Sequence, residues 1–320
     1  MVSTIELIKR TARGASKTGS PQLYIISFTS LFLALLFLYE IIRTIRITKS
    51  IWKNVTSRFR ILVLSFSFIG LFIQTLTALI SFNWESIFLI FFFYVNLVYW
   101  FIYSSYIAYI FYVVKTLQLI EGKQTKIRKY SDLIFGILII ITFALLILFC
   151  YLDAKNLNDN TKFSDAYRLQ NLYNIIWILP LSIIFIVISI KSYKKFGGYI
   201  LVKIQKERIK YVLILTIIGC CFFGAFLIWV IFSVSGANKM SNNLKSYLEN
   251  EEYSKFDNFN LFFHFIFFFI PSFIIFFFLH HILTIEKRMF QREENILLAD
   301  PDDDGIIYNK NEYKLMDIIN

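Results

Sequence analysis

Seven long apolar runs divide this chain, and each is long enough to cross a lipid bilayer as a helix. A helix rises about 1.5 Å per residue, so roughly 20 apolar residues cover the hydrocarbon core. Because lipid offers no hydrogen-bond partners, a spanning segment must satisfy its own backbone, which favours helix. We therefore predict an all-α, seven-transmembrane-helix bundle with these spans: Leu23–Ile42, Phe59–Phe82, Ser86–Val114, Leu133–Leu152, Tyr173–Ile190, Tyr211–Val234 and Phe259–Leu283.

Two of these runs leave the number of spans open. The fifth is short and contains Pro180, and the third is long enough to tilt or to project from the bilayer. Six and eight spans are therefore the alternatives to seven. The division gives a basic tail at 1–22, a membrane domain at 23–284 and a polar tail at 285–320 that we expect to be disordered.

The composition agrees with a bilayer environment and argues against a soluble protein. Hydrophobic residues make up 57% of the chain and charged residues only 17%, against roughly 25% charged in soluble domains. A net charge of +11 could suggest nucleic acid. The basic residues, however, are scattered between the apolar runs and form no single face, so we expect a lipid partner and no nucleic acid.

The basic residues also predict the orientation. If the predicted spans alternate in direction, 23 of the 33 Lys and Arg residues fall on one side of the membrane. Positive loops stay in the cytosol, so the N-terminus should be lumenal or external and the C-terminus cytosolic. Lys9, Arg10, Arg13 and Lys17 argue against this, but the six basic residues that follow the first span, from Arg43 to Arg60, outnumber them.

Few residues inside the spans can carry chemistry. Glu40 lies three residues before Arg43, which predicts a local ion pair with Glu40 reaching towards the interface. His264 and His280 are about 24 Å apart along one helix, so the histidines do not converge on a metal site. We find no catalytic triad and no acid–base pair, and we expect no enzyme activity, cofactor or metal.

Other polar and aromatic residues in the spans have structural explanations. The neutral polar positions, such as Asn96 and Ser105, should hydrogen-bond between helices. Aromatic residues such as Tyr99 and Trp100 should serve as packing and interface anchors. The three cysteines lie in or at the edge of spans and should be buried, unreactive thiols.

The polar tail carries two sequences that resemble sorting signals. Glu293, Leu297 and Leu298 fit an acidic dileucine pattern, and Tyr313 with Met316 fits a tyrosine-based pattern. Cytosolic trafficking adaptors bind both types, and together they predict residence in endosomes or lysosomes. The alternative is an unstructured polar tail with a few apolar residues.

Short segments of the chain resemble the plant tobamovirus-multiplication-protein family, which includes animal lysosomal proteins similar to orphan G-protein-coupled receptors. The resemblance rests on the basic exit of the first span at Arg43 and Arg46, on Gly197-Gly198 and on Pro271-Ser272. It also includes Cys220-Cys221-Phe222 in the sixth span. Acids that plant members carry beside the Pro-Ser pair and in the third span are absent here.

The resemblance implies residence in a vacuolar or lysosomal membrane and binding of small GTPases or their regulators. The first hypothesis is therefore a receptor-like or scaffold protein whose working face is the cytosolic basic loops. The basic residues of these loops that we single out are Arg43, Arg46, Lys194, Lys195, Lys203 and Lys206. The alternatives are a G-protein-coupled receptor at the plasma membrane and a small-solute transporter or channel, for which the spans offer little polar pathway.

Overall fold

The computed structural model describes five helical stretches, at residues 21–47, 55–79, 91–120, 126–158 and 265–281. It also describes isolated helical positions, singly or in pairs, at 89, 180, 183–184, 186–187, 190, 219, 224, 261 and 283–284. All of these residues are helical. The described part of the chain therefore has the all-α architecture that the sequence predicts.

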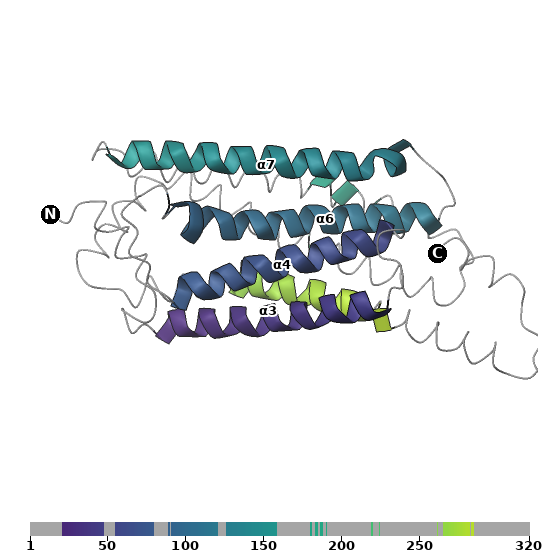
Figure 1. Ribbon diagram of the computed structural model, residues 1–320, viewed down its shortest axis with the longest axis horizontal. Helices are drawn as coiled ribbons and strands as arrows, with labels where there is room; N and C mark the ends of the chain where they lie inside the picture. The colour runs from purple at the N-terminus through teal and green to yellow at the C-terminus, as the bar shows by residue number, and fades with distance from the viewer. Residues whose placement is uncertain are drawn as a thin grey trace, which may run out of the picture.

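Four long helices run along the longest axis of the molecule (Figure 1). They are α3 (Pro21–Ile47), α4 (Val55–Leu79), α6 (Leu97–Ile120) and α7 (Lys126–Asn158). Each is antiparallel to the one before it, and α4 packs between α3 and α6 while α7 lies on the far side of α6. The end of α3, the start of α4, the end of α6 and the start of α7 therefore share one end of the bundle.

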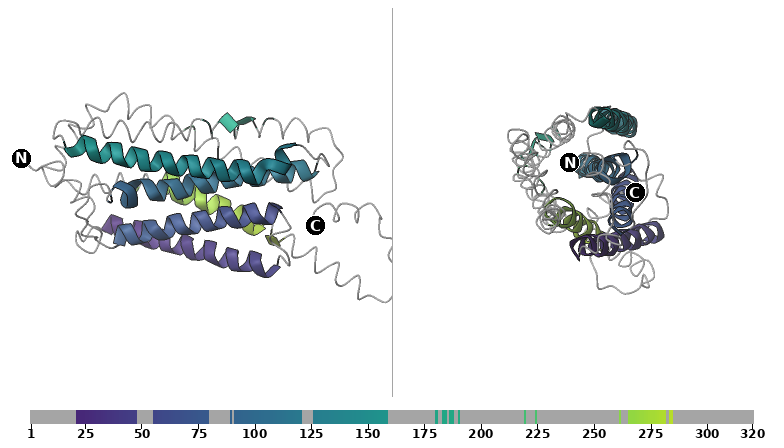
Figure 2. Two further views of the ribbon diagram at one scale, coloured as in Figure 1. Left: turned by 45° about the horizontal axis from the view of Figure 1, so that its top comes forward. Right: turned by 90° about the vertical axis from the view of Figure 1, so that its left-hand side faces the viewer.

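A fifth helix begins as a π-helical turn, η2 (Phe265–Phe269), and continues as an α-helix over Ile270–His281. We call these 17 residues the η2 helix. Figure 2 shows it, in yellow-green, beside α3 although the two are far apart in the sequence. Ring contacts fix its position: Phe276 packs against Phe37 of α3, and Phe278 packs against Tyr109 of α6. The η2 helix thus lies between α3 and α6.

Four helices are long and apolar enough to cross a membrane: Pro21–Ile47, Ser57–Leu79, Leu97–Lys115 and Tyr130–Leu152. At about 1.5 Å per residue, even the 19 residues of Leu97–Lys115 cover about 28 Å, close to the thickness of the hydrocarbon core. These helices confirm that the first four predicted apolar runs form helices of spanning length. The prediction of seven helices is not confirmed by them, because the predicted spans Tyr173–Ile190 and Tyr211–Val234 lie largely outside the described residues.

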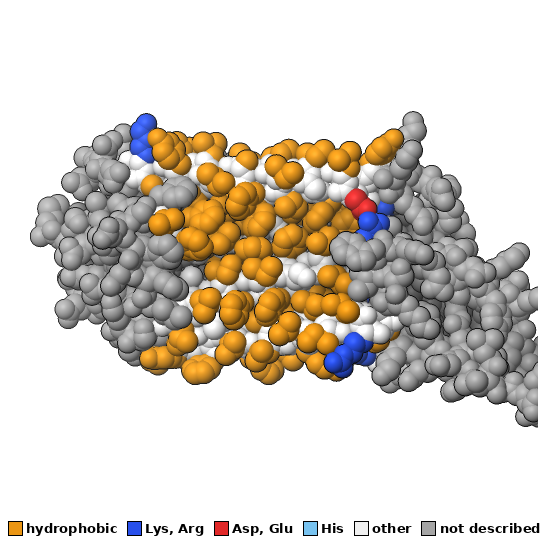
Figure 3. Space-filling view, in the orientation of Figure 1, with side chains coloured by type: hydrophobic (Ala, Val, Ile, Leu, Met, Phe, Trp, Pro, Cys, Tyr) orange, Lys and Arg blue, Asp and Glu red, His pale blue; other side chains and the backbone are white. Residues whose placement is uncertain are grey.

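The outer surface of the bundle is apolar, as a lipid-facing surface must be. On α3 the exposed side chains include Phe28, Phe32 and Leu35, which follow a helical spacing. On α7 they include Ile137 and Ile140, and Ile140 is 70% exposed. Figure 3 shows a continuous hydrophobic band across the middle of one face, with charged side chains at its two ends. Water would not tolerate an apolar surface of this extent on a soluble monomer, whereas lipid does.

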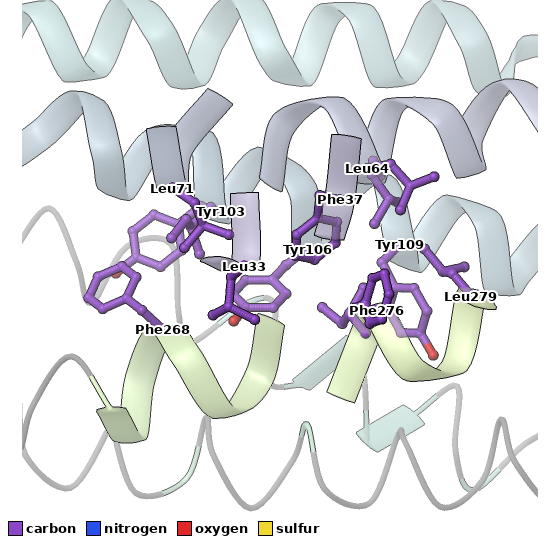
Figure 4. Packing of buried hydrophobic residues seen from close by; sticks show 14 of the residues in the cluster. Leu33, Phe37, Leu64, Leu71, Tyr103, Tyr106, Tyr109, Phe268, Phe276 and Leu279 are labelled. Atoms are coloured by element: carbon purple, nitrogen blue, oxygen red, sulfur yellow. The ribbon is translucent and has the colours of Figure 1, made fainter. Parts of the chain in front are cut away.

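The core of the bundle is aromatic and is centred on α6. Figure 4 shows Tyr103, Tyr106 and Tyr109 of α6 meeting side chains of α3 and of the η2 helix, among them Phe37 and Phe276. Phe37 is fully buried and packs edge-to-face with Phe276 at a centroid distance of 5.8 Å. Such pairs add about 0.5–1.5 kcal/mol beyond the burial of area. These three tyrosines therefore hold three helices together, as expected for aromatic packing residues in the spans.

Pro271 is accommodated by a local change of helix type. Proline lacks an N–H and its ring collides with the carbonyl four residues earlier, which strains a regular α-helix. Here the wider π-helical turn Phe265–Phe269 ends two residues before Pro271, and the α-helix continues through the proline. Pro271 and Ser272 are both buried, so this part of the chain packs inside the bundle. A second π-helical turn, η1 (Phe91–Asn96), leads into α6.

Candidate functional site

The structure places only some of the residues that the sequence singles out. Arg43 and Arg46 occupy the last turns of α3, and Pro271 and Ser272 lie in the η2 helix. The remaining sites lie outside the described residues: Lys194, Lys195, Gly197, Gly198, Lys203, Lys206, Glu293, Leu297, Leu298, Tyr313 and Met316. The site below is therefore built from the described helices alone.

A cluster of polar and charged side chains joins α3 to the η2 helix. We call Glu40, Arg43, His280 and Thr284 the α3–η2 cluster. Nη1 of Arg43 lies 2.8 Å from Nδ1 of His280, and Nη2 donates to Oγ1 of Thr284 at 2.8 Å. Oε2 of Glu40 lies 2.9 Å from the same Nδ1. The first and the last of the five described helical stretches are thus linked by charge at this point.

Glu40 is completely buried, and this corrects one expectation. The predicted local ion pair with Arg43 is present, at 3.4 Å between Nη1 and Oε1. The prediction that Glu40 reaches out towards the interface is wrong, because its side chain is 0% exposed. It turns inward because Arg43 and His280 supply positive and hydrogen-bonding partners inside the bundle. A buried carboxylate requires such partners, since its desolvation is otherwise too costly.

The orientation of the His280 ring is set by packing as well as by hydrogen bonds. Phe276, one turn earlier on the same helix, stacks on the ring with a centroid distance of 5.7 Å. Oγ1 of Thr284 donates to the backbone carbonyl of His280 at 2.8 Å while it accepts from Arg43. Stacking fixes the plane of the imidazole, and Thr284 fixes the guanidinium beside it. Nδ1 of His280 therefore faces Glu40 and Arg43 together.

Other basic residues share this end of the bundle. Arg58 of α4 pairs with Asp132 of α7 at 2.9 Å, with both side chains partly exposed. Arg60 of α4 is 2% exposed and its guanidinium lies 5.8 Å from the centre of the Tyr112 ring of α6. A cation over an aromatic face gains electrostatic attraction that is stronger away from water. Lys115, near the end of α6, is also buried. Among the described residues, Lys155 lies at the far end of α7.

The neutral polar side chains form hydrogen bonds both between and within helices. Ser105 of α6 shares a 2.7 Å hydrogen bond with Ser67 of α4 and donates to the carbonyl of Val63 at 3.1 Å. Trp100 donates to Thr142 of α7 at 2.8 Å. These contacts confirm the expected interhelical bonding at Ser105. Thr75, in contrast, donates to the carbonyl of Leu71 in its own helix.

Asn96 and Cys150 meet at the opposite half of the bundle. Asn96, at the end of η1, donates from its amide nitrogen to the sulfur of Cys150 on α7 at 3.2 Å. Both side chains are buried, and Cys150 is not part of a disulfide. This confirms the prediction that Cys150 is a buried cysteine. The pairing itself was missed, because nothing in the spacing of the two residues indicates it.

Sequence reasoning also missed His280 as a partner of Glu40. The two are 240 residues apart, and their contact requires α3 and the η2 helix to be neighbours. The sequence offered one signal for this contact: an acidic residue inside one apolar run and a histidine inside another, both near helix ends that the charge pattern assigns to the same side of the membrane.

Comparison with family models, with curated proteins and with solved structures gave no match for the chain.

Proposed function

We propose that this chain is a receptor-like or scaffold protein with several membrane spans, resident in an endolysosomal or vacuolar membrane. It engages cytosolic partners at the end of the bundle where α3 ends and α4 begins, at which Arg46 is exposed while Arg60 and Lys115 are buried. The structure contributes one part of this statement, namely that several apolar helices are suited to a membrane. Residence, receptor-like character and partners are the proposal.

The observation that carries the proposal is the gathering of basic residues at one end of an apolar bundle. The end of α3 and the start of α4 bring four arginines to this end, and the end of α6 adds Lys115. Positive residues flanking apolar helices favour the cytosolic leaflet. In the seven-span topology that the sequence predicts, the connection that contains Lys194 and Lys195 lies at the same end. Arg60 and Lys115 are buried, so contact with anionic lipid or with an acidic protein surface falls to exposed side chains such as Arg46.

The choice of membrane rests on the sequence of the tail. The acidic dileucine pattern and the tyrosine-based pattern occur within the same 36 residues, 285–320. Adaptors that bind such patterns direct membrane proteins to endosomes and lysosomes. We therefore expect the full-length protein in those organelles.

A fluorescent fusion should colocalise with an endolysosomal marker, and a Leu297→Ala, Leu298→Ala, Tyr313→Ala variant should accumulate at the cell surface. An unmodified protein that stays at the cell surface would refute the assignment and favour the surface receptor.

A second experiment separates protein partners from lipid. The variant replaces the four lysines of the connection after the fifth span by Gln: Lys194, Lys195, Lys203 and Lys206. A matched control replaces Lys239, Lys245 and Lys255 by Gln in the connection assigned to the lumenal side. We expect the first variant to lose cytosolic partners, among them small GTPases or their regulators, in pull-down from membranes, and the control to keep them. Equal recovery by both variants would contradict the partner proposal and leave anionic lipid as the ligand of these lysines.

A further inference from the structure

We propose that the outward face of α3 binds an anionic phospholipid, with the headgroup on Arg46 and the acyl chains along the apolar side chains that precede it. The proposal deepens the proposed function, because it selects lipid, and not an acidic protein, as the ligand of Arg46. It rests on that function only in assigning this end of the bundle to the cytosolic leaflet.

The exposed side chains of α3 include a stripe that runs along one face of the helix. Its members lie alternately four and three residues apart, which keeps them on the same side. The first five are large hydrophobic side chains, between 43% and 66% exposed, and the last is a cation. In order they are Phe28, Phe32, Leu35, Tyr39, Ile42 and Arg46. A ligand that covers the end of this face must therefore be apolar along its length and anionic at one end.

The length of α3 places the cation at the depth of the lipid headgroups. The 27 residues of α3 extend over about 40 Å, which is close to the thickness of a bilayer with its headgroups. Arg46 lies in the last turn, and Ile42 lies one turn, about 6 Å, closer to the hydrocarbon core. Figure 3 shows basic side chains at this end of α3, directly beside the hydrophobic band. A phospholipid presents its phosphate and its chains in the same order.

The positive charge of Arg46 is not matched within the described helices, whereas that of Arg43 is. Arg43 forms an ion pair with Glu40 at 3.4 Å and donates to Thr284 at 2.8 Å. Arg46 has neither an ion pair nor a side-chain hydrogen bond with any residue that the structure describes. Its guanidinium carries N–H donors in a planar fork that fits two oxygens of one phosphate. A headgroup with a net negative charge neutralises this cation, and a zwitterionic headgroup does not.

The apolar side chains next to Arg46 favour lipid over an acidic protein. A protein that approaches from water would satisfy the charge alone and would leave Tyr39 and Ile42 to other molecules. A phospholipid satisfies both requirements at once, because its phosphate reaches Arg46 while its chains cover Tyr39 and Ile42, which are 57% and 43% exposed. Basic side chains at the membrane surface attract anionic lipids in this way.

Fluorescence quenching by lipid in vesicles tests the proposal. The full-length protein carries one bimane fluorophore at Ile42→Cys, one turn from Arg46, in a background without native cysteines. The vesicles contain equal parts of phosphatidylserine and phosphatidylcholine, and in parallel samples one or the other carries brominated chains, which quench bimane on contact. We expect phosphatidylserine to be preferred about fivefold, the factor that corresponds to about 1 kcal/mol for one arginine. Arg46→Gln should remove the preference, and Arg46→Lys, which keeps the charge, should retain most of it.

Two controls show whether the effect is local to Arg46. Lys155→Gln removes an exposed cation at the opposite end of the bundle and should leave the preference at Ile42→Cys unchanged. Bimane at Phe28→Cys reports from the other end of the same face of α3, and Arg46→Gln should not alter its quenching.

Two results would overturn the proposal. One is equal quenching by the two lipids in the parent protein, which would leave Arg46 to an acidic protein surface. The other is a preference for phosphatidylserine that persists in Arg46→Gln. Both leaflets of the vesicles have the same composition, so the result depends neither on the orientation of the protein nor on the organelle in which it resides. A failure of the lipid site is thereby distinguished from a failure of the proposed function, which the localisation and pull-down experiments test.

Discussion

Replacing Gly70 by alanine should weaken the packing of α4 against α6. A methyl group built at Gly70 would lie 3.1 Å from Cβ of Phe101 and 3.2 Å from Cγ1 of Ile102. It would also lie 3.6 Å from the carbonyl oxygen of Val98. Cβ of Phe101 is bonded to the backbone and cannot rotate away. The extra carbon therefore fits only if the two helices separate by a few tenths of an ångström. Small residues at such crossings are what allow close helix packing in membranes.

The magnitude follows from two opposing effects. Alanine is the better helix former by about 1 kcal/mol in water, and this gain is the upper limit in lipid. Overpacking of a well-filled interface costs about 1–3 kcal/mol. Separation of α4 from α6 also loosens contacts around the buried Leu71 and Ile102. We expect a net destabilisation of about 1–2 kcal/mol for Gly70→Ala, and a larger one for the bulkier Gly70→Val.

Gly136 of α7 provides a matched control. It also lies in a long apolar helix, but a methyl group there would have nothing within 4 Å. Gly136→Ala therefore changes helix propensity without crowding, and its effect should be neutral or stabilising by up to about 1 kcal/mol. The difference between the two variants isolates the contact between α4 and α6.

The assay is reversible unfolding of the purified protein in mixed micelles, followed by circular dichroism as a denaturing detergent is added. The free energies of unfolding of the parent, Gly70→Ala and Gly136→Ala are compared under identical conditions. If the two alanine variants prove equally stable, the close approach of α4 to α6 at this position is wrong. If Gly70→Ala is the more stable of the two, the packing argument is refuted outright.

Three further predictions concern the hydrogen bonds and ion pairs. Arg43→Gln should lower the free energy of unfolding by about 3 kcal/mol, because it removes the positively charged partner of the buried Glu40. Glu40→Gln should cost less, because Arg43 is partly exposed and keeps Thr284, and the double variant should cost less than the sum; additive effects in the same unfolding assay would contradict the ion pair. Trp100→Phe should lower the free energy of unfolding by about 0.6 kcal/mol, which is typical of a hydrogen bond in a membrane protein. In a Thr142→Val background, where this hydrogen bond is already lost, the same substitution should cause no further loss. Asp132→Asn breaks an exposed pair, so its effect should stay below about 1 kcal/mol and fade in high salt, and a larger effect that is independent of salt would show that this pair is effectively buried.

The existence of the first four helices could be predicted from the sequence because lipid imposes a simple constraint. A run such as Leu133–Leu152 has no favourable state other than a helix once it lies in hydrocarbon. Its ends were less predictable: α7 extends from Lys126 to Asn158, well beyond the apolar run. Beyond the bilayer, helix length depends on local propensity and on contacts such as the Arg58–Asp132 pair, and not on the thickness of the membrane.

The pairing of helices could not be predicted in the same way. Every run in this chain is similarly apolar, so hydropathy does not say which helix is the neighbour of which. The contact between Glu40 and His280 depends on the position of the η2 helix between α3 and α6, and that position is set by the shapes of Phe37, Phe276 and Tyr109. Sequence patterns identified Glu40 and Arg43 as a local pair, while the third partner required the structure.

Labelling of single cysteines from one side of a sealed membrane tests the central claim most directly. Cysteine is introduced at Arg46 at the end of α3, at Asp132 near the start of α7 and at Lys155 near its end, each in a background without native cysteines. These side chains are exposed. In sealed endolysosomal vesicles with the cytosolic face outward, a reagent that cannot cross the membrane should label Arg46→Cys and Asp132→Cys, while Lys155→Cys should react only after the membrane is opened. Equal labelling of all three before opening would contradict an account in which α7 crosses the bilayer with the basic end of the bundle in the cytosol.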